Sequence, residues 1–139
     1  MPAFNKFEQF VKDLGDKVHD LDADTISIYL SNALPSVSAD LIKTDVTEIT
    51  QENGYAGPVD TVQAWTEAAG VGSCTQNADI VITASGGTVG PFQYVVLFND
   101  TPAAPLDPLI GWWDYGSVVL LQDGETFTIN FGTEMFTIT

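Results

Sequence analysis

The densest group of side chains that could hold a cation is Asp20, Asp22 and Asp24, which alternate as the first ligands of a calcium-binding loop do. Such a loop also needs glycine at its sixth position and glutamate at its twelfth, and these positions are Thr25 and Ser31. We therefore predict that the three aspartates cap a turn. No metal site is expected, and a loose cation site on the surface is the alternative.

Nucleophilic catalysis would need His19, the only histidine, beside a serine or cysteine in space. The sequence contains no nucleophile-elbow motif, and the lone Cys74 is predicted to be a free, buried thiol. The glycine-rich segment 86–91 lacks the Lys-Ser/Thr of a phosphate loop. A carboxylate pair for glycoside hydrolysis depends on separation in space, which acid content does not reveal. We predict no catalytic residue and no cofactor, so the chain is not expected to be an enzyme.

The most unusual string is GWWDYG at 111–116. Adjacent strand residues point to opposite faces, so Trp112 and Trp113 cannot share one core layer. One is expected in the core and the other at a second face or a subunit contact. The alternative is that Trp112, Trp113 and Tyr115 stack on a sugar whose hydroxyls Asp114 binds.

An amphipathic helix is predicted over about residues 5–19, in front of the strands. Its apolar positions recur at spacings of three and four: Phe4, Phe7, Val11, Leu14 and Val18. Asn5 is a suitable N-cap, with Glu8 three positions later as in a capping box. This seam packs either on the protein's own sheet or against a partner, and Phe10, off the seam, favours a second contact surface.

After the helix the apolar period becomes two, beginning with a half-buried strand at 25–31. Residues 32–58 read as a long connection, a place to look for partner contacts. Further strands are predicted at 59–66, 78–84, 92–99, 109–115, 117–122, 125–131 and 134–138. Asp123-Gly124 is the strongest hairpin signal. We expect a mainly β chain: an N-terminal helix or arm at 1–22 and a jelly-roll-like β-sandwich domain at 23–139.

The charge is strongly asymmetric, with 19 acidic residues against four lysines and a formal charge of −15. All four lysines lie within residues 1–43, so no base faces the acids of 44–139. Nucleic-acid affinity comes largely from Lys and Arg, so no nucleic-acid partner is expected. There is no apolar run long enough to span a membrane and no secretory signal, so we expect no membrane association and synthesis in the cytoplasm.

Three segments together resemble a family of small structural proteins of tailed bacteriophages. They are GPFQYVVLFND at 90–100, PLIGWWDYG at 108–116 and DGETFTI at 123–129. The order of the earlier segments is also similar: a helix, DTISIYL at 24–30, DVTEI at 45–49, NGY at 53–55 and a Trp-Thr pair at 65–66. These are structural motifs, so the resemblance carries over no catalytic residue.

The resemblance implies a virion protein, most simply a capsid decoration or cement protein that binds the outside of the major capsid lattice. A tail or baseplate component, or a receptor-binding adaptor, is the alternative. The implied partners are the major capsid protein or other virion proteins, with assembly as a trimer or dimer on the outer surface of the head. The candidate interface residues are Phe4, Phe7, Phe10, Val11, Leu14, Val18, Trp112, Trp113 and Tyr115.

Overall fold

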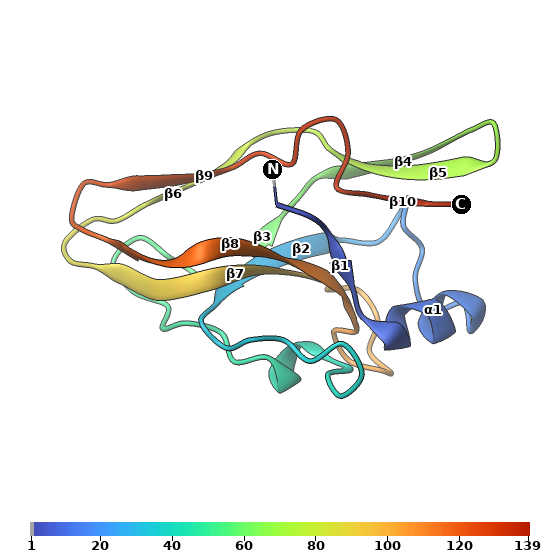
Figure 1. Ribbon diagram of the computed structural model, residues 1–139, viewed down its shortest axis with the longest axis horizontal. Helices are drawn as coiled ribbons and strands as arrows, with labels where there is room; N and C mark the ends of the chain where they lie inside the picture. The colour runs from blue at the N-terminus through green and yellow to red at the C-terminus, as the bar shows by residue number, and fades with distance from the viewer. Residues whose placement is uncertain (1) are drawn as a thin grey trace.

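The computed structural model describes residues 2–139, which form one short α-helix, one 3-10 turn and ten β-strands. The strands lie in two facing layers, with α1 at one end of the molecule (Figure 1). The elements are β1 (Asn5–Lys6), α1 (Glu8–Gly15), β2 (Ile26–Ser31), the 3-10 turn (Lys43–Asp45), β3 (Val59–Asp60), β4 (Gln63–Ala68), β5 (Val71–Gln76), β6 (Ile80–Thr83), β7 (Val89–Asn99), β8 (Leu109–Leu121), β9 (Thr126–Ile129) and β10 (Phe136–Ile138). The chain is mainly β, with one helix near its start followed by the strands of a sandwich.

The larger layer is an antiparallel sheet in the order β1-β8-β7-β2-β3. Its strand β2 has the alternating sequence of a half-buried strand, yet all six residues are buried. The connection over 32–58 covers its outer face and supplies polar partners. The Tyr29 hydroxyl lies 2.9 Å from the carbonyl oxygen of Val46, and the Ser31 hydroxyl donates to the carbonyl of Thr47 over 2.6 Å.

The facing layer contains a sheet in the order β10-β5-β4 and the pair β6-β9. The pairing is nested, because β5 pairs with β10, β6 with β9 and β7 with β8. An antiparallel ribbon folded over on itself gives this order, as in jelly rolls. The predicted β-sandwich is confirmed, and a cluster of apolar side chains that includes Cys74, Phe92 and Ile110 fills its interior.

Several strand boundaries differ from those that the sequence predicts. The strands expected at 109–115 and 117–122 are one strand, β8. Tyr94 pairs with Asp114 and Phe92 with Val119, so a shorter stretch of β7 lies opposite a longer stretch of β8, and the extra residues of β8 form a bulge. β5 was missed because its sequence VGSCTQ has little apolar alternation. The strand expected at 59–66 is divided into β3 and β4 around Val62, whose φ is +49°.

The turn at Asp123-Gly124 forms, but the predicted hairpin around it is wrong. The strands on either side of it pair elsewhere, β8 with β7 and β9 with β6. The turn instead carries the chain from one layer to the other, and the backbone N–H of Gly124 donates to the carbonyl of Ala84 over 2.7 Å.

The N-terminal helix is shorter than predicted, and its predicted N-cap is wrong. Asn5 lies in β1, opposite Trp112, and the helix begins after Phe7, which has extended backbone and no side-chain cap. Strand pairing holds these first residues extended. The first N–H group of the helix, that of Glu8, donates to the backbone carbonyl of Val37 over 3.0 Å. The segment expected as an arm at 1–22 thus shares its sheet and its core with the sandwich.

The turn at Asn53-Gly54 allows a stability prediction. Gly54 has a φ of +102°, and a β-carbon there would overlap the carbonyl oxygen of Thr83. Since both the backbone and the space exclude a side chain, we expect Gly54→Ala to lower the free energy of unfolding by about 2 kcal/mol. Gly124→Ala is the matched control, because Gly124 has a φ of +88° with open space around it. This substitution should lower the free energy of unfolding by about 1 kcal/mol. Equal losses in urea denaturation would show that the contact with Thr83 is unimportant.

Candidate functional site

The candidate interface residues lie in three separate places. Those of the N-terminal segment, except Phe7, line a cleft between α1 and the β10-β5-β4 sheet. Phe7 and Trp112 pack together on the outer face of the larger sheet. Trp113 and Tyr115 line a small hollow beside β9. The single seam expected along the helix is therefore divided, because residues before Glu8 are extended and do not follow helical spacing.

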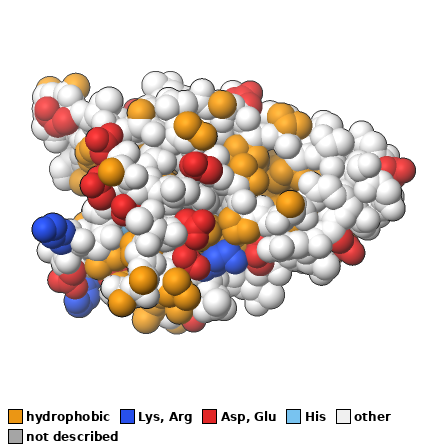
Figure 2. All heavy atoms as spheres, turned by 180° about the vertical axis from the view of Figure 1, so that it is seen from behind, with side chains coloured by type: hydrophobic (Ala, Val, Ile, Leu, Met, Phe, Trp, Pro, Cys, Tyr) orange, Lys and Arg blue, Asp and Glu red, His pale blue; other side chains and the backbone are white. Residues whose placement is uncertain are grey.

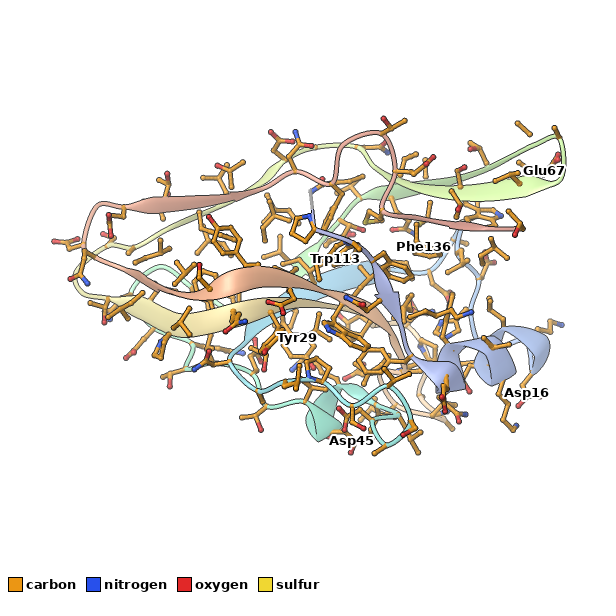
Figure 3. The ribbon with its side chains drawn as sticks, in the orientation of Figure 1. Asp16, Tyr29, Asp45, Glu67, Trp113 and Phe136 are labelled. Atoms are coloured by element: carbon orange, nitrogen blue, oxygen red, sulfur yellow. The ribbon has the colours of Figure 1, made fainter. Side chains whose placement is uncertain are left out.

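The cleft consists of two adjoining hollows of about 310 and 620 Å³, to both of which Leu14 and Ile138 contribute. The smaller hollow is lined by Phe4, Lys6, Phe10, Val11, Leu14, Phe136, Thr137, Ile138 and Thr139. The larger is lined by Leu14, Lys17, Val18, His19, Asp20, Leu21, Asp22, Asp24, Trp65 and Ile138. Figure 3 shows the two walls, with α1 near Asp16 on one side and β10 near Phe136 on the other. Hollows of this size accommodate several atoms of a ligand or side chains of a partner.

The floor of the cleft is rigidly packed and its rim is accessible. Phe10 is 1% exposed, and its ring lies edge-on to Phe136 with 5.8 Å between centroids. Phe4 stacks on the same ring at 5.0 Å. Val11, by contrast, is 54% exposed, and Leu14 is only partly buried. The helix therefore buries Phe10 in the protein's own core and presents Val11 to solvent, the reverse of the predicted seam.

The charges of the two hollows differ. Lys6 has the only charged side chain among the described residues that line the smaller hollow. The larger hollow is lined by Asp20, Asp22 and Asp24 together with Lys17. Figure 2 shows acidic side chains scattered over the rear face, with basic ones gathered mainly at the end where α1 lies. The cleft thus lies in the one region where this acidic chain carries most of its lysines.

The three aspartates of the larger hollow form the capped turn that the sequence predicts. The Asp20 carboxylate accepts backbone N–H groups of Asp22 and Ala23 over 3.1 and 3.0 Å. The Asp24 carboxylate accepts the backbone N–H of Asp20 over 2.9 Å and the side-chain amide of Asn99 over 2.7 Å. Within residues 2–139 there is no group of three or more His, Cys, Asp or Glu side chains placed to hold a metal ion.

His19 is packed against the core instead of beside a nucleophile. Its ring lies edge-on to Phe10 at 5.1 Å, and its Nδ1 lies 3.2 Å from the side-chain amide of Asn99. Burial lowers the pKa of His19, although Asp13 and Asp24 oppose this effect. These contacts attach the turn after α1 to the end of β7.

The two tryptophans face opposite sides of the larger sheet, as strand geometry predicts. Trp112 packs on Phe7 at 4.7 Å in the outer cluster, and Trp113 packs on Phe131 at 4.2 Å in the inner core. They are 6% and 3% exposed, while Tyr115 is 51% exposed. A sugar platform of all three is therefore wrong. The hollow beside Trp113 and Tyr115 holds about 100 Å³, below the roughly 300 Å³ at which ligand pockets begin.

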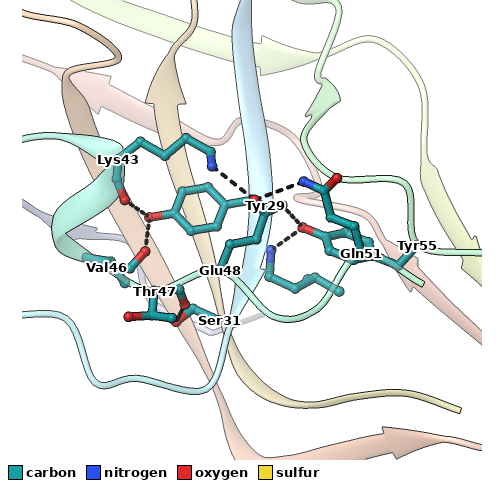
Figure 4. A network of polar contacts seen from close by, with 9 residues as sticks. Tyr29, Ser31, Lys43, Val46, Thr47, Glu48, Gln51 and Tyr55 are labelled. Atoms are coloured by element: carbon teal, nitrogen blue, oxygen red, sulfur yellow. Dashed lines mark hydrogen bonds and ion pairs between the residues drawn. The ribbon is translucent and has the colours of Figure 1, made fainter.

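A half-buried polar network holds the long connection onto the larger sheet (Figure 4). Lys43 and Glu48 form an ion pair at 3.0 Å, with side chains 19% and 14% exposed. The Tyr55 hydroxyl donates to Glu48 over 2.7 Å and accepts the backbone N–H of Leu30 over 3.1 Å. The Lys43 ammonium also lies 4.8 Å from the centre of the Tyr29 ring. Sequence reasoning missed this network because its members are separated along the chain and meet only through the covering loop.

The single cysteine is a free, buried thiol, as predicted. Cys74 is 0% exposed, and burial raises the pKa of its thiol to about 12 from an ordinary value of 9.0. A thiolate is the reactive form, so a water-soluble aromatic disulfide reagent at pH 8 should modify Cys74 only after denaturation. Rapid modification of the folded protein would contradict this burial.

The same shift predicts the direction of an alkaline effect on stability. Between pH 9 and pH 12 the unfolded thiol ionises while the folded thiol keeps its proton. The contribution of Cys74 to the free energy of unfolding should therefore be constant below pH 9 and fall above it. Burial also raises the pKa values of Tyr29 and Tyr55, which act in the same direction. Urea denaturation as a function of pH would measure this, and rising stability above pH 9 would contradict it.

Comparisons with known protein families, with curated proteins and with solved structures found no match to this chain. Within the described residues no helix is long and apolar enough to cross a membrane.

Proposed function

We propose that this chain is a bacteriophage virion structural protein, a capsid decoration protein that binds the outside of the major capsid lattice and stabilises the head. The observation that carries the proposal is the cleft beside α1, where five of the expected interface residues meet on a partly exposed surface: Phe4, Phe10, Val11, Leu14 and Val18. The resemblance of three segments of the chain to phage structural proteins supports the same role.

A decoration protein that bridges two capsid subunits needs two contact surfaces, and the long connection supplies a second. Leu34, Val37, Leu41 and Leu106 are 73%, 43%, 44% and 58% exposed. The segments that contain Leu41 and Leu106 are held together, because the Leu109 N–H donates to the carbonyl of Leu41 over 3.1 Å. Two such surfaces on one rigid sandwich suit a bridging role, in which several weak contacts act together.

Charge favours an exterior position. A chain with a formal charge of −15 is repelled by packaged DNA, so the outer face of the head is the compatible side of the shell. The proposed partner is the major capsid protein, and trimers or dimers around a symmetry axis are the proposed assembly.

Copy number in purified particles tests the proposal. Quantitative gel densitometry against the major capsid protein should give hundreds of copies per virion if the chain decorates the lattice. A few copies would favour the alternative, a tail or baseplate component. Absence from purified virions would overturn the proposal.

A further inference from the structure

We propose that His19 forms an acid-sensitive contact that attaches the turn after α1 to the sandwich. The neutral ring accepts a hydrogen bond from Asn99 at the end of β7, and the protonated ring leaves Asn99 and bonds to Asp13 on α1. This inference is independent of the proposed function. It is carried by the hydrogen bonds of Asn99 and by two buried polar atoms, one on His19 and one on Asp13, that have no partner among the described residues.

The contacts of Asn99 fix which nitrogen of the neutral His19 ring carries the proton. Asn99 is 0% exposed, and its side-chain nitrogen donates to Asp24 over 2.7 Å and lies 3.2 Å from Nδ1 of His19. Its side-chain oxygen accepts the backbone N–H of Thr101 over 3.1 Å. The amide therefore cannot turn over without losing its bonds to Asp24 and Thr101. Nδ1 is the acceptor, so the proton of the neutral ring lies on Nε2.

This arrangement leaves one donor and one acceptor unused. Nε2 of His19 is buried without a hydrogen-bond partner among residues 2–139, and the same is true of Oδ2 of Asp13. Asp13 is 3% exposed, and its other carboxylate oxygen accepts from the side chain of Gln9 over 2.9 Å. A buried carboxylate with an unused oxygen is unfavourable, and a cation that reaches it offsets this cost. The charge of Asp13 also favours the protonated form of His19, because it raises the pKa of the ring.

Protonation reverses the preference of the ring for Asn99. The added proton goes to Nδ1, where it meets the amide donor of Asn99, so two donors face each other and the contact is lost. Asn99 is held by Asp24 and Thr101, so His19 is the group that moves. The imidazolium then gains a charge-assisted hydrogen bond to Oδ2 of Asp13.

The groups around His19 determine the pH at which this change occurs. Asp13 on α1 and Asp24 in the turn act on the ring by their charges. The larger hollow, which His19 lines, adds three charged residues: Lys17, Asp20 and Asp22. The facing strands contribute uncharged groups: the Asn99 amide of β7, Trp65 of β4 and Ile138 of β10. Burial outweighs the two carboxylates and lowers the pKa of His19 from its ordinary value of 6.5, so the change lies at a more acidic pH.

Loss of the Asn99 contact releases the start of the turn and leaves its end in place. The end stays attached because the Gln63 side chain donates to the carbonyls of Leu21 and Asp24 over 3.1 and 2.7 Å. Since His19 lines the larger hollow, its movement changes the shape of that hollow in acid.

Nuclear magnetic resonance of the purified protein tests the inference directly, because His19 is its only histidine. Above pH 7 the ring nitrogens should show the proton on Nε2, and the ring should titrate once, below pH 6.5. The side-chain amide of Asn99 and the carboxyl carbon of Asp13 should shift with the same midpoint. A proton on Nδ1 of the neutral ring, or a titration that leaves Asn99 unchanged, would overturn the inference.

A matched pair of variants tests the role of Asp13. Asp13→Asn keeps the size of the side chain and removes its charge, so the measured pKa of His19 should fall further. Asp16→Asn is the control, because Asp16 is an exposed carboxylate at the end of α1 that pairs with Lys12. It should leave the pKa of His19 unchanged. Equal effects of the two variants would show that Asp13 does not receive the protonated ring.

Stability provides an independent measurement. Because the pKa of His19 is lowered by folding, its contribution to the free energy of unfolding is complete above pH 6.5 and is lost as the pH falls below that value. His19→Asn places an amide oxygen that cannot be charged where it can accept from Asn99. Urea denaturation should therefore show a smaller loss below pH 6.5 for His19→Asn than for the unaltered protein. Equal losses would contradict the inference, and circular dichroism would confirm that each variant is folded.

Discussion

Replacing Phe10 by alanine should lower the free energy of unfolding by about 3 to 5 kcal/mol. Phe10 is 1% exposed and is enclosed by the rings of His19 and Phe136. Truncation removes this apolar contact and leaves a void that a close-packed sandwich cannot fill. A loss of that size is a large fraction of the total stability of a domain of this length.

The neighbouring residue provides the control. Val11 is 54% exposed, so Val11→Ala should change the free energy of unfolding by less than about 0.5 kcal/mol. Urea denaturation of both variants measures the difference. If Val11→Ala cost as much as Phe10→Ala, the helix would bury the seam that its sequence spacing predicts. Phe7 is 0% exposed, so a variant with aspartate at both Phe7 and Val11 should unfold.

Replacing Lys43 by methionine should lower the free energy of unfolding by about 3 kcal/mol. This value is at the lower end for breaking a buried ion pair, because both partners are slightly exposed. The substitution leaves the Glu48 carboxylate, 14% exposed, without its cation. Glu48 also accepts from Tyr55 and Gln51, so loss of the ion pair should loosen the connection over 32–58. Hydrogen exchange in that connection should rise along with the loss of stability.

An exposed ion pair gives the comparison. Lys12 and Asp16 pair on the surface of α1, with side chains 68% and 50% exposed. Solvent screens such a pair, so Lys12→Met should leave the denaturation midpoint unchanged within error. A similar midpoint shift in both variants would show that the Lys43 pair acts as an ordinary surface pair.

The two layers of the fold could be predicted from the sequence. That residues 32–58 cover the outer face of the larger sheet could not. The alternating apolar residues of β2, the continuous apolar run of β7 and regular turn residues were enough to indicate a sandwich. Alternation alone also predicted an exposed face for Tyr29 and Ser31, yet both are buried. Their hydroxyls bond to the carbonyls of Val46 and Thr47, and that pairing depends on how residues 32–58 fold back.

The candidate site was predicted in part. Phe4, Val11 and Leu14 do meet in one cleft, although they were grouped by a helical period that starts too early. Phe7 is also apolar, but it lies on the outer face of the larger sheet with Trp112. The chain is extended from β1 up to the start of α1, so the side chain of Phe7 does not follow the helical spacing. Trp65 and Ile138 had no local signal, since the far strands β4 and β10 bring them to α1.

Cryo-electron microscopy of purified virions tests the central proposal most directly. The proposal predicts density for this sandwich at repeated positions over the outer capsid surface, with the cleft beside α1 against the major capsid protein. Density confined to the tail, or a lattice contact made through the distant β6-β9 pair, would contradict it.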